Sequence, residues 1–394
     1  MFNYKKNINL MFGIFMAFLA FKPIILSVDP KYDTLYSMLT YLSLMIFFSI
    51  AIYNLIVLKK LKLTSQWLIL LLFMLWLMVS SLINVNNNTD QVLTFLSIIG
   101  FISIFDITNK YFKYIIRGVD VYCIILILVN LITQLLYPTE GLYHNWANSW
   151  QPYYVCGNGN SFVFFYLFSA GIASIDFYLS KKDKFPLWVL IYEAILYYSI
   201  SLEHTSTGKA VILLLIIITF FSTRVVINIL RKHYKKVGVF ILGIFLFFII
   251  YGGWKEKLVQ NIIYDFTGEN ANLIARGEIW VSSINSVLKS PILGYGANSF
   301  NLAIGDGGLQ RSAHNNYLQI MLLGGIPSLI MYVSFIALSF KSFSREKTRQ
   351  DKASYYCSII ILLYLVAYFF EQNPYNIGFF TFCFLVSKIA KTNE

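Results

Sequence analysis

The sequence predicts an all-α, polytopic membrane protein, and three observations carry that prediction. Of the 394 residues, 58% are hydrophobic and only 13% are charged, whereas a soluble globular domain carries about 25% charged residues. The mean hydropathy is +0.65. Apolar runs of about 20 residues recur along the chain, each long enough to cross a bilayer as a helix that satisfies its own backbone hydrogen bonds. We therefore expect about twelve transmembrane helices in a single membrane domain, residues 1–394.

The first predicted span follows Lys5 and Lys6 and resembles a signal peptide. It lacks a small-x-small cleavage pattern, so we expect it to remain as a span. No internal repeat or low-complexity linker divides the chain. The spans are expected at residues 8–28, 35–58, 66–84, 91–106, 119–137, 160–180, 186–202, 209–223, 237–253, 316–340, 354–371 and 375–390.

The basic residues predict the topology. With alternating spans, 23 of the 31 lysines and arginines fall on the side that carries both termini. Because cytoplasmic loops retain Lys and Arg, we expect both termini in the cytoplasm. The net charge of +12 then reflects topology, and nucleic acid is not an expected partner. The remaining eight are Lys22, Lys31, Lys209, Lys255, Lys257, Arg276, Lys289 and Arg311.

This topology places three polar segments outside: residues 138–160, 203–209 and the long loop 254–315. An extracytoplasmic site meets neither ATP nor nucleotide sugars. Chemistry there must use a substrate that carries its own activation, such as a lipid-linked diphosphate.

Arg276 begins a predicted amphipathic helix within the long loop. Apolar residues between 279 and 288 recur at helical spacing, which is typical of a helix lying at the membrane interface. The Arg276 guanidinium could grip a substrate phosphate in fork geometry. The alternative is an arginine that extends to lipid headgroups. Downstream, Pro291 stops this helix, and Gly294 and Gly296 permit a tight turn with backbone amides near a ligand.

His314 lies where the long loop runs into the next apolar span. Ser312 to Asn315 are expected to cap this helix, whose N-terminus offers unpaired amides and partial positive charge. With Arg311 and Asn315 beside it, the position suits an anionic phosphate. His314 could deprotonate a sugar hydroxyl or hold a leaving phosphate, and the alternative is a histidine that only caps the helix. After it, Gly324-Gly325-Ile326-Pro327 predicts a kink within the span.

Other polar or reactive positions give weaker indications. Lys209 could add a point charge for a diphosphate or simply extend toward water. Aromatic residues of loop 138–160, among them Trp146, Trp150 and Tyr154, could stack on sugars or form an interfacial belt. The four cysteines show neither CxxC nor Cys/His spacing, so neither a disulfide framework nor a metal site is indicated.

Several of these segments together resemble the O-antigen polymerase/ligase family of multi-spanning bacterial glycosyltransferases. The resemblance is carried by Arg276 with Trp280, Pro291–Gly296, Ala313-His314-Asn315 and Gly325-Ile326-Pro327, with Gly157–Ser161 and Ser206–Lys209 as further similar stretches. It implies a GT-C-like fold in the cytoplasmic (inner) membrane. It also implies an undecaprenyl-diphosphate-linked oligosaccharide as substrate, transfer with inversion, and neither a metal nor another cofactor. On that pattern Arg276 would hold the diphosphate and His314 would act at the acceptor hydroxyl or the phosphate.

We therefore expect a polysaccharide polymerase that transfers a growing glycan onto a lipid-linked repeat unit at the outer membrane face. Membrane lipids, a flippase and a chain-length regulator are the implied partners. A ligase that passes finished glycan to another acceptor is the nearest alternative. A transporter of the same lipids is a third, although the internal repeat typical of many transporters is absent from the sequence.

Overall fold

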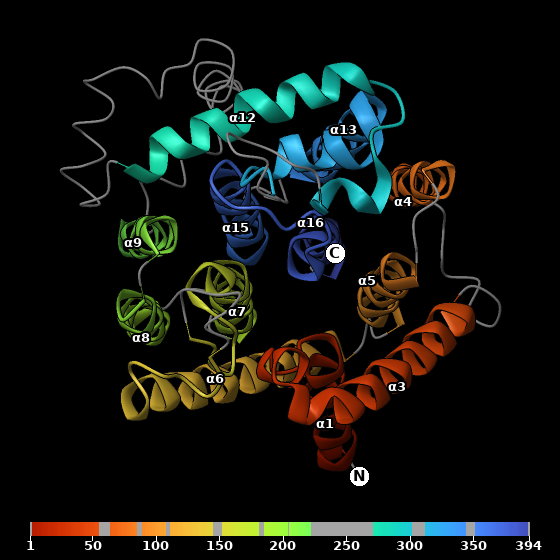
Figure 1. Ribbon diagram of the computed structural model, residues 1–394. Coiled ribbons are helices and arrows are strands. Elements are labelled where there is room, and N and C mark those ends of the chain that lie inside the picture. Colours follow the sequence, from red (N-terminus) through yellow and green to blue (C-terminus); the bar gives the residue numbers. More distant parts are fainter. Residues whose placement is uncertain are drawn as a thin grey trace.

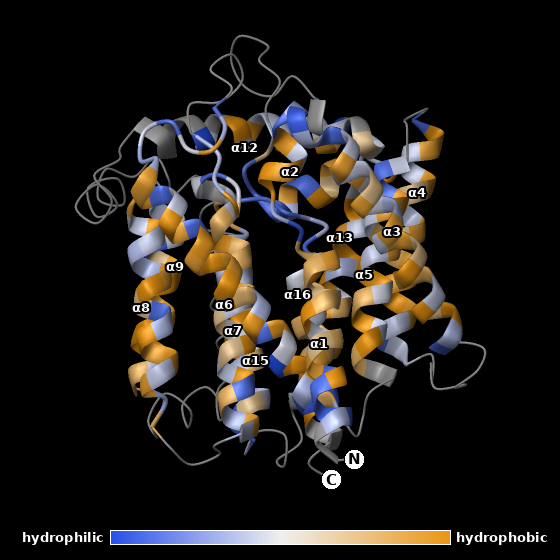
Figure 2. Ribbon diagram, turned by 90° about the horizontal axis from the view of Figure 1, so that it is seen from below, coloured by the Kyte–Doolittle hydropathy of each residue, from blue (hydrophilic) through white to orange (hydrophobic). Residues whose placement is uncertain are grey.

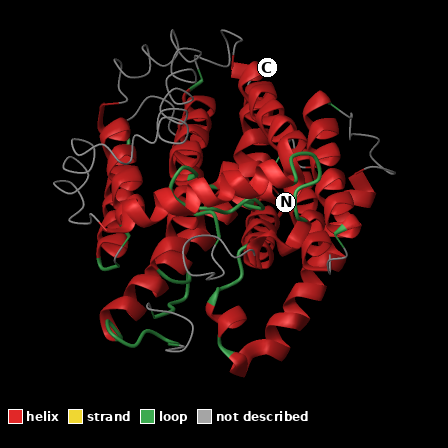
Figure 3. Cartoon of the chain, turned by 45° about the horizontal axis from the view of Figure 1, so that its top comes forward, coloured by secondary structure: helices red, strands yellow, loops and turns green. Residues whose placement is uncertain are grey.

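The computed structural model describes residues 2–54, 64–84, 89–107, 111–144, 152–180, 185–203, 205–221, 271–301, 312–343 and 351–392. Over these residues the protein consists of helices and loops without a named strand (Figure 3). The predicted all-α class is confirmed. The elements are α1 (Phe2–Ala20), α2 (Ile25–Val28), η1 (Pro30–Tyr32), α3 (Asp33–Ile52), α4 (Ser65–Ile83), α5 (Thr89–Ile107), α6 (Phe112–Leu136), α7 (Gly159–Ser180), α8 (Leu187–Ser201), α9 (Ser206–Phe221), α12 (Ala271–Lys289), η4 (Gly296–Asn301), α13 (Asn316–Phe343), α15 (Lys352–Ala367) and α16 (Ile377–Thr392).

Six segments of the described chain are long and apolar enough to cross a membrane: Tyr4–Val28, Pro30–Ile52, Ser65–Ile83, Phe112–Leu136, Ser161–Ser180 and Asn316–Lys341. Five further apolar helices, in α5, α8, α9, α15 and α16, are shorter. The protein is thus a polytopic helical membrane protein. The predicted span 237–253 lies outside the described residues.

Most helices run along a common axis, and α12 lies across one end of the bundle (Figures 1 and 2). The start of α1 and the end of α16 lie together at the opposite end (Figure 2). Hydrophilic loop segments gather beneath α12, between helices that are coloured mainly as hydrophobic (Figure 2). These hydrophilic loops thus lie toward the end of the fold that is opposite the start of α1 (Figure 2).

Helices α1 and α6 approach closely through a pair of glycines. Gly13 and Gly118 face each other, and a Cβ added at Gly118 would lie 2.2 Å from the backbone oxygen of Leu10. Small residues at such crossings let helix backbones pack tightly within lipid. Helix α1 is consequently packed closely against α6.

Substituting Gly118 by alanine is expected to destabilise the protein by at least about 2 kcal/mol, because the new methyl group meets backbone atoms that cannot rotate away. The thermal transition of the detergent-purified protein measures this effect. Ile125→Ala, on an outward-facing part of α6 where the side chain is 53% exposed, is the matched control and should change the transition little. An unchanged transition for Gly118→Ala would contradict the α1–α6 packing.

The kink in α13 is confirmed, but it lies at the glycines rather than at Pro327. Gly324 (φ −141°) and Gly325 (φ 69°) leave helical geometry. The freed backbone pairs with the turn after α12: the Ile326 amide donates to Pro291 O at 2.7 Å, and the Tyr295 amide to Leu322 O at 2.7 Å. A Cβ at Gly325 would lie 2.2 Å from Ile292 O, so only glycine permits this contact. The kink therefore supplies the backbone groups that fix the end of α12 against α13.

Within two predicted spans the helix stops before the apolar run does, and both breaks matter for the site. The apolar run 8–28 is interrupted after Ala20 by Lys22 and Pro23 before the short α2 begins. The run 354–371 stops being helical after Ala367, so Glu371 lies in the loop before α16. Both predicted spans followed the apolar residues past the end of the helix. Hydropathy does not show where helical backbone hydrogen bonding stops.

Candidate functional site

Helix α12 is fixed on α13 by a small apolar cluster separate from the main core. Trp280 is 2% exposed and is the largest member. The cluster comprises Ile279, Trp280, Val287, Ala313, Leu318 and Leu322. The predicted amphipathic helix is confirmed, although it begins at Ala271 rather than at Arg276, and its apolar face packs on protein. This packing sets Arg276, one turn before Trp280, above the start of α13.

Arg276 reaches from α12 to the loop between α15 and α16. Its Nη1 donates to Phe370 O at 2.8 Å, and its Nη2 forms a salt bridge with Glu371 Oε1 at 2.9 Å. The Glu371 side chain is 7% exposed. A guanidinium carries five N–H donors, so three remain that bond to no described residue. These two bonds fix the orientation of the guanidinium and leave three of its N–H donors for an anionic ligand.

His314 has a backbone conformation that few side chains adopt. Its φ is 44°, and it is the one non-glycine residue with positive φ among the described residues. This left-handed region costs about 1–3 kcal/mol outside glycine, and such strain gathers at functional sites. Fixed residues on either side hold it: the Ala313 amide donates to Gln319 Oε1 at 3.2 Å, and Asn315 caps α13.

His314 faces the same carboxylate that Arg276 binds. Its Nδ1 lies 4.0 Å from Glu371 Oε2, beyond hydrogen-bond distance, and this nitrogen is buried without a described hydrogen-bond partner. Glu371 thus binds Arg276 through Oε1, and its Oε2 lies on the side of His314. With Nδ1 turned toward a carboxylate, the Nε2 atom of the imidazole is the one left to accept a proton.

Asn315 and Asn316 tie the start of α13 to the loop 368–373. Asn315 Oδ1 accepts from the amides of Tyr317 and Leu318, at 3.0 and 3.1 Å, and its Nδ2 donates to Phe369 O at 3.1 Å. Asn316 Oδ1 accepts from the Asn373 amide at 3.0 Å. The expected helix cap is confirmed, with Asn315 as the capping residue. Both side chains are fully buried, so they position His314 and Glu371.

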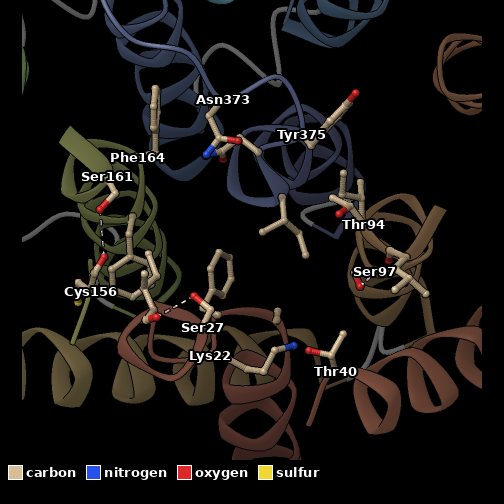
Figure 4. Close-up of a pocket in the computed structure, with 18 of the residues that line it drawn as sticks. Lys22, Ser27, Thr40, Thr94, Ser97, Cys156, Ser161, Phe164, Asn373 and Tyr375 are labelled. Carbon is tan, nitrogen blue, oxygen red and sulfur yellow. Dashed lines mark hydrogen bonds between the residues drawn. The ribbon is translucent and has the colours of Figure 1, made fainter. Parts of the chain in front are cut away.

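A cavity of about 550 Å³ opens beside this group, and Glu371 is on its wall. The cavity lies between the ends of α1, α3, α5, α7 and α16 (Figure 4). Lys22, Thr40, Ser161, Asn373 and Tyr375 line it from different elements (Figure 4). Its size falls within the usual range of ligand pockets, about 300–1,000 Å³.

The other predicted site residues lie apart from the pair of Arg276 and His314. Gly294 (φ 66°) faces the break in α13, where a Cβ would lie 2.6 Å from Leu322 O, and Gly296 (φ 63°) begins η4. These two glycines thus have structural contacts, and their ligand contact stays a prediction. Lys209 lies in the first turn of α9 and is not among the cavity-lining residues. Arg311 lies outside the described residues.

The aromatic loop before α7 contributes structure at Tyr154. This side chain is 1% exposed, and its hydroxyl donates to the carbonyls of Tyr137 and Pro138 at 3.2 and 3.1 Å. Burial raises the pKa of Tyr154 to about 12, so it stays a neutral donor. It closes the loop rather than offering a face to sugars. Trp146 and Trp150 lie outside the described residues.

Glu371 and Lys22 are site residues that sequence reasoning missed. Glu371 was hidden at the end of an apolar run, and Lys22 was used only to assign topology. The signal was nevertheless present, since ionisable residues within or next to a membrane span are functional candidates by default. Glu371 is an acidic residue placed between two predicted spans on the expected outer side, the side that also carries Arg276 and His314.

Residues 194–333, from α8 into α13, match the family model described as O-Antigen ligase. This segment is therefore similar to the O-antigen polymerase/ligase family. The match confirms the resemblance and includes Arg276 and His314, whereas Glu371 and Lys22 lie beyond it. Members of the family are glycan-transferring enzymes.

No curated protein and no solved structure matches the chain, and the expected GT-C likeness stays a prediction. Within the described part of the chain, no three His, Cys, Asp or Glu side chains gather as a metal site would require. The expectation of metal-free transfer likewise stays a prediction.

Proposed function

We propose that this O-antigen polymerase/ligase-family protein polymerises a surface polysaccharide on the outer face of the bacterial cytoplasmic membrane. It would transfer a growing glycan from undecaprenyl diphosphate onto a lipid-linked repeat unit. The observation that carries the proposal is the meeting of Arg276 and His314 at Glu371, a residue that lines the cavity. These residues come from three segments far apart in the sequence.

In this proposal Arg276 neutralises the leaving diphosphate. Negative charge accumulates on the diphosphate as the bond to the sugar breaks, and a preorganised guanidinium stabilises that charge. The bonds to Phe370 O and Glu371 hold the guanidinium in place before substrate arrives. Orientation of this kind lowers the barrier because little reorganisation accompanies the reaction.

His314 is proposed to accept the proton of the attacking hydroxyl. The acceptor oxygen forms the new bond to the anomeric carbon, the bond to the diphosphate breaks, and the hydroxyl proton passes to Nε2. Glu371 Oε2, on the Nδ1 side of the ring, would stabilise the imidazolium that forms. Distances of this kind are often long without substrate and shorten in the complex, so 4.0 Å is compatible with the role.

Ladder formation distinguishes a polymerase from a ligase. Purified protein given the lipid-linked repeat unit alone is expected to form a ladder of glycans differing by one unit. A substrate that stays unchanged until a second acceptor is added would reject polymerisation in favour of ligation. The readout is gel electrophoresis of labelled glycan after release from the lipid.

The ligase reading is the second candidate, and one observation favours it. The matching family model is described by ligase activity. The site chemistry would be the same, because the same leaving group departs and only the acceptor hydroxyl differs. The cavity beside Glu371 would then receive the non-lipid acceptor or its sugar end.

A further inference from the structure

Lys22 is a partly buried cation on the cavity wall that has no carboxylate partner among the described residues. Its Nζ donates to Leu19 O and to Ser43 Oγ, each at 3.2 Å. It also lies 5.8 Å from the ring centre of Tyr36. An ammonium has three N–H donors, so one donor remains that bonds to no described residue.

The charges along the cavity do not cancel. Among its lining residues, all within the described chain, Lys22 is the one lysine or arginine and Glu371 the one carboxylate. Glu371 is already neutralised by Arg276 at 2.9 Å. The positive charge of Lys22 is thus left over. Burying an unpaired charge costs free energy unless a counter-ion meets it, so a bound anion would compensate it.

The remaining walls carry apolar side chains, such as Phe164 and Phe165, together with neutral hydrogen-bonding groups. Hydroxyls of Thr40, Thr94 and Ser97 and amides of Asn158 and Asn373 belong to this lining. Two further oxygens, Thr40 Oγ1 and Gln372 Oε1, are buried without a described hydrogen-bond partner. Thr40 lies one turn before Ser43 on α3, and Figure 4 shows it on the same wall as Lys22. Neutral hydroxyls and amides around one cation suit a sugar that carries a single negative group.

We propose that this cavity binds the glycan of the substrate through an anionic substituent, a carboxylate or phosphate on a sugar, that pairs with Lys22. The protein would then act on an acidic polysaccharide. The inference rests on the proposed function and adds the class of glycan to it.

The first test is genetic and chemical. Deletion of the gene from the producing bacterium, with complementation by variants, compares polysaccharide yield and composition. The lost polysaccharide is expected to contain a uronic acid or another anionic sugar. Lys22→Gln is expected to lower the yield at least about tenfold at equal membrane abundance, because a charge pair is lost. Lys22→Arg should restore most of it, and Lys31→Gln, a matched change outside the cavity, should leave it unaltered.

Two results would overturn the proposal. One is a neutral polysaccharide, and the other is a wild-type yield from Lys22→Gln. If Lys22→Gln fails to accumulate in the membrane, the composition alone decides: an acidic glycan supports the proposal and a neutral one rejects it.

A binding measurement separates the glycan from the lipid carrier as the source of the anion. Sugar-free undecaprenyl diphosphate is titrated into wild-type and Lys22→Gln protein in nanodiscs. Equal affinities are expected. A weakening of about tenfold or more in the variant would assign Lys22 to the carrier diphosphate and reject the acidic-glycan inference. If Arg276 variants lose polymer while Lys22→Gln does not, this inference alone fails. If deletion of the gene loses no polysaccharide, the proposed function fails, and this inference with it.

Discussion

Replacing Arg276 by alanine is expected to lower glycan transfer by at least about a thousandfold. The magnitude follows from the known effect of removing one preorganised donor, about 10²–10³, and from the larger effect of arginines that neutralise transferring phosphates. Transfer is measured with the lipid-linked repeat unit and purified protein. Arg276→Lys keeps the charge but loses the fork, so we expect an intermediate rate.

A control is needed because Arg276 also has a structural partner. Its removal leaves the buried Glu371 carboxylate without a counter-charge, which costs about 3–5 kcal/mol of stability. The double variant Arg276→Ala/Glu371→Gln removes both charges and should regain most of the lost stability while remaining inactive. Recovery of activity together with stability would show that Arg276 acts only on the fold.

His314→Asn is the second substitution with a large expected effect. Asparagine, like histidine, tolerates positive φ, so the strained backbone at φ 44° should persist and the protein should stay folded. The variant lacks a group that can accept the hydroxyl proton. Transfer should fall by about 10²–10⁴, the usual contribution of general base catalysis. The initial rate of glycan transfer by protein of unchanged thermal transition is the measurement.

Two neighbouring variants sharpen this result. His314→Gly should also fold and be inactive, whereas His314→Ala has the same chemical defect and additional backbone strain. If His314→Asn transfers glycan at the wild-type rate, His314 has only a structural role before α13, whose cap is Asn315.

The sequence predicted the elements of this fold well where periodicity and charge decide. The apolar spans, the amphipathic helix after Arg276 and the cap at Asn315 all follow from local patterns. The kink was expected as well, but Gly324 and Gly325 rather than Pro327 provide it. A glycine pair allows the backbone to pair with residues 291–295, and that pairing depends on tertiary contacts that periodicity does not contain.

Only part of the site was predicted from the sequence. Arg276 and His314 could be singled out because each is an unusual residue at the edge of an apolar run. Glu371 could not be paired with them, since the 56 residues between His314 and Glu371 hide their proximity in space. Lys22 was explained by topology, and only the cavity reveals that its charge lacks a partner.

Release of undecaprenyl diphosphate tests the central claim most directly. Purified wild-type protein, Arg276→Ala and His314→Asn are incubated with the labelled lipid-linked repeat unit, with and without a second glycan acceptor. The free carrier and the new glycosidic bonds are then counted. We predict one carrier released for each bond formed by the wild type, and almost none by either variant. Bond formation without carrier release, or release by Arg276→Ala at the wild-type rate, would contradict the proposed site.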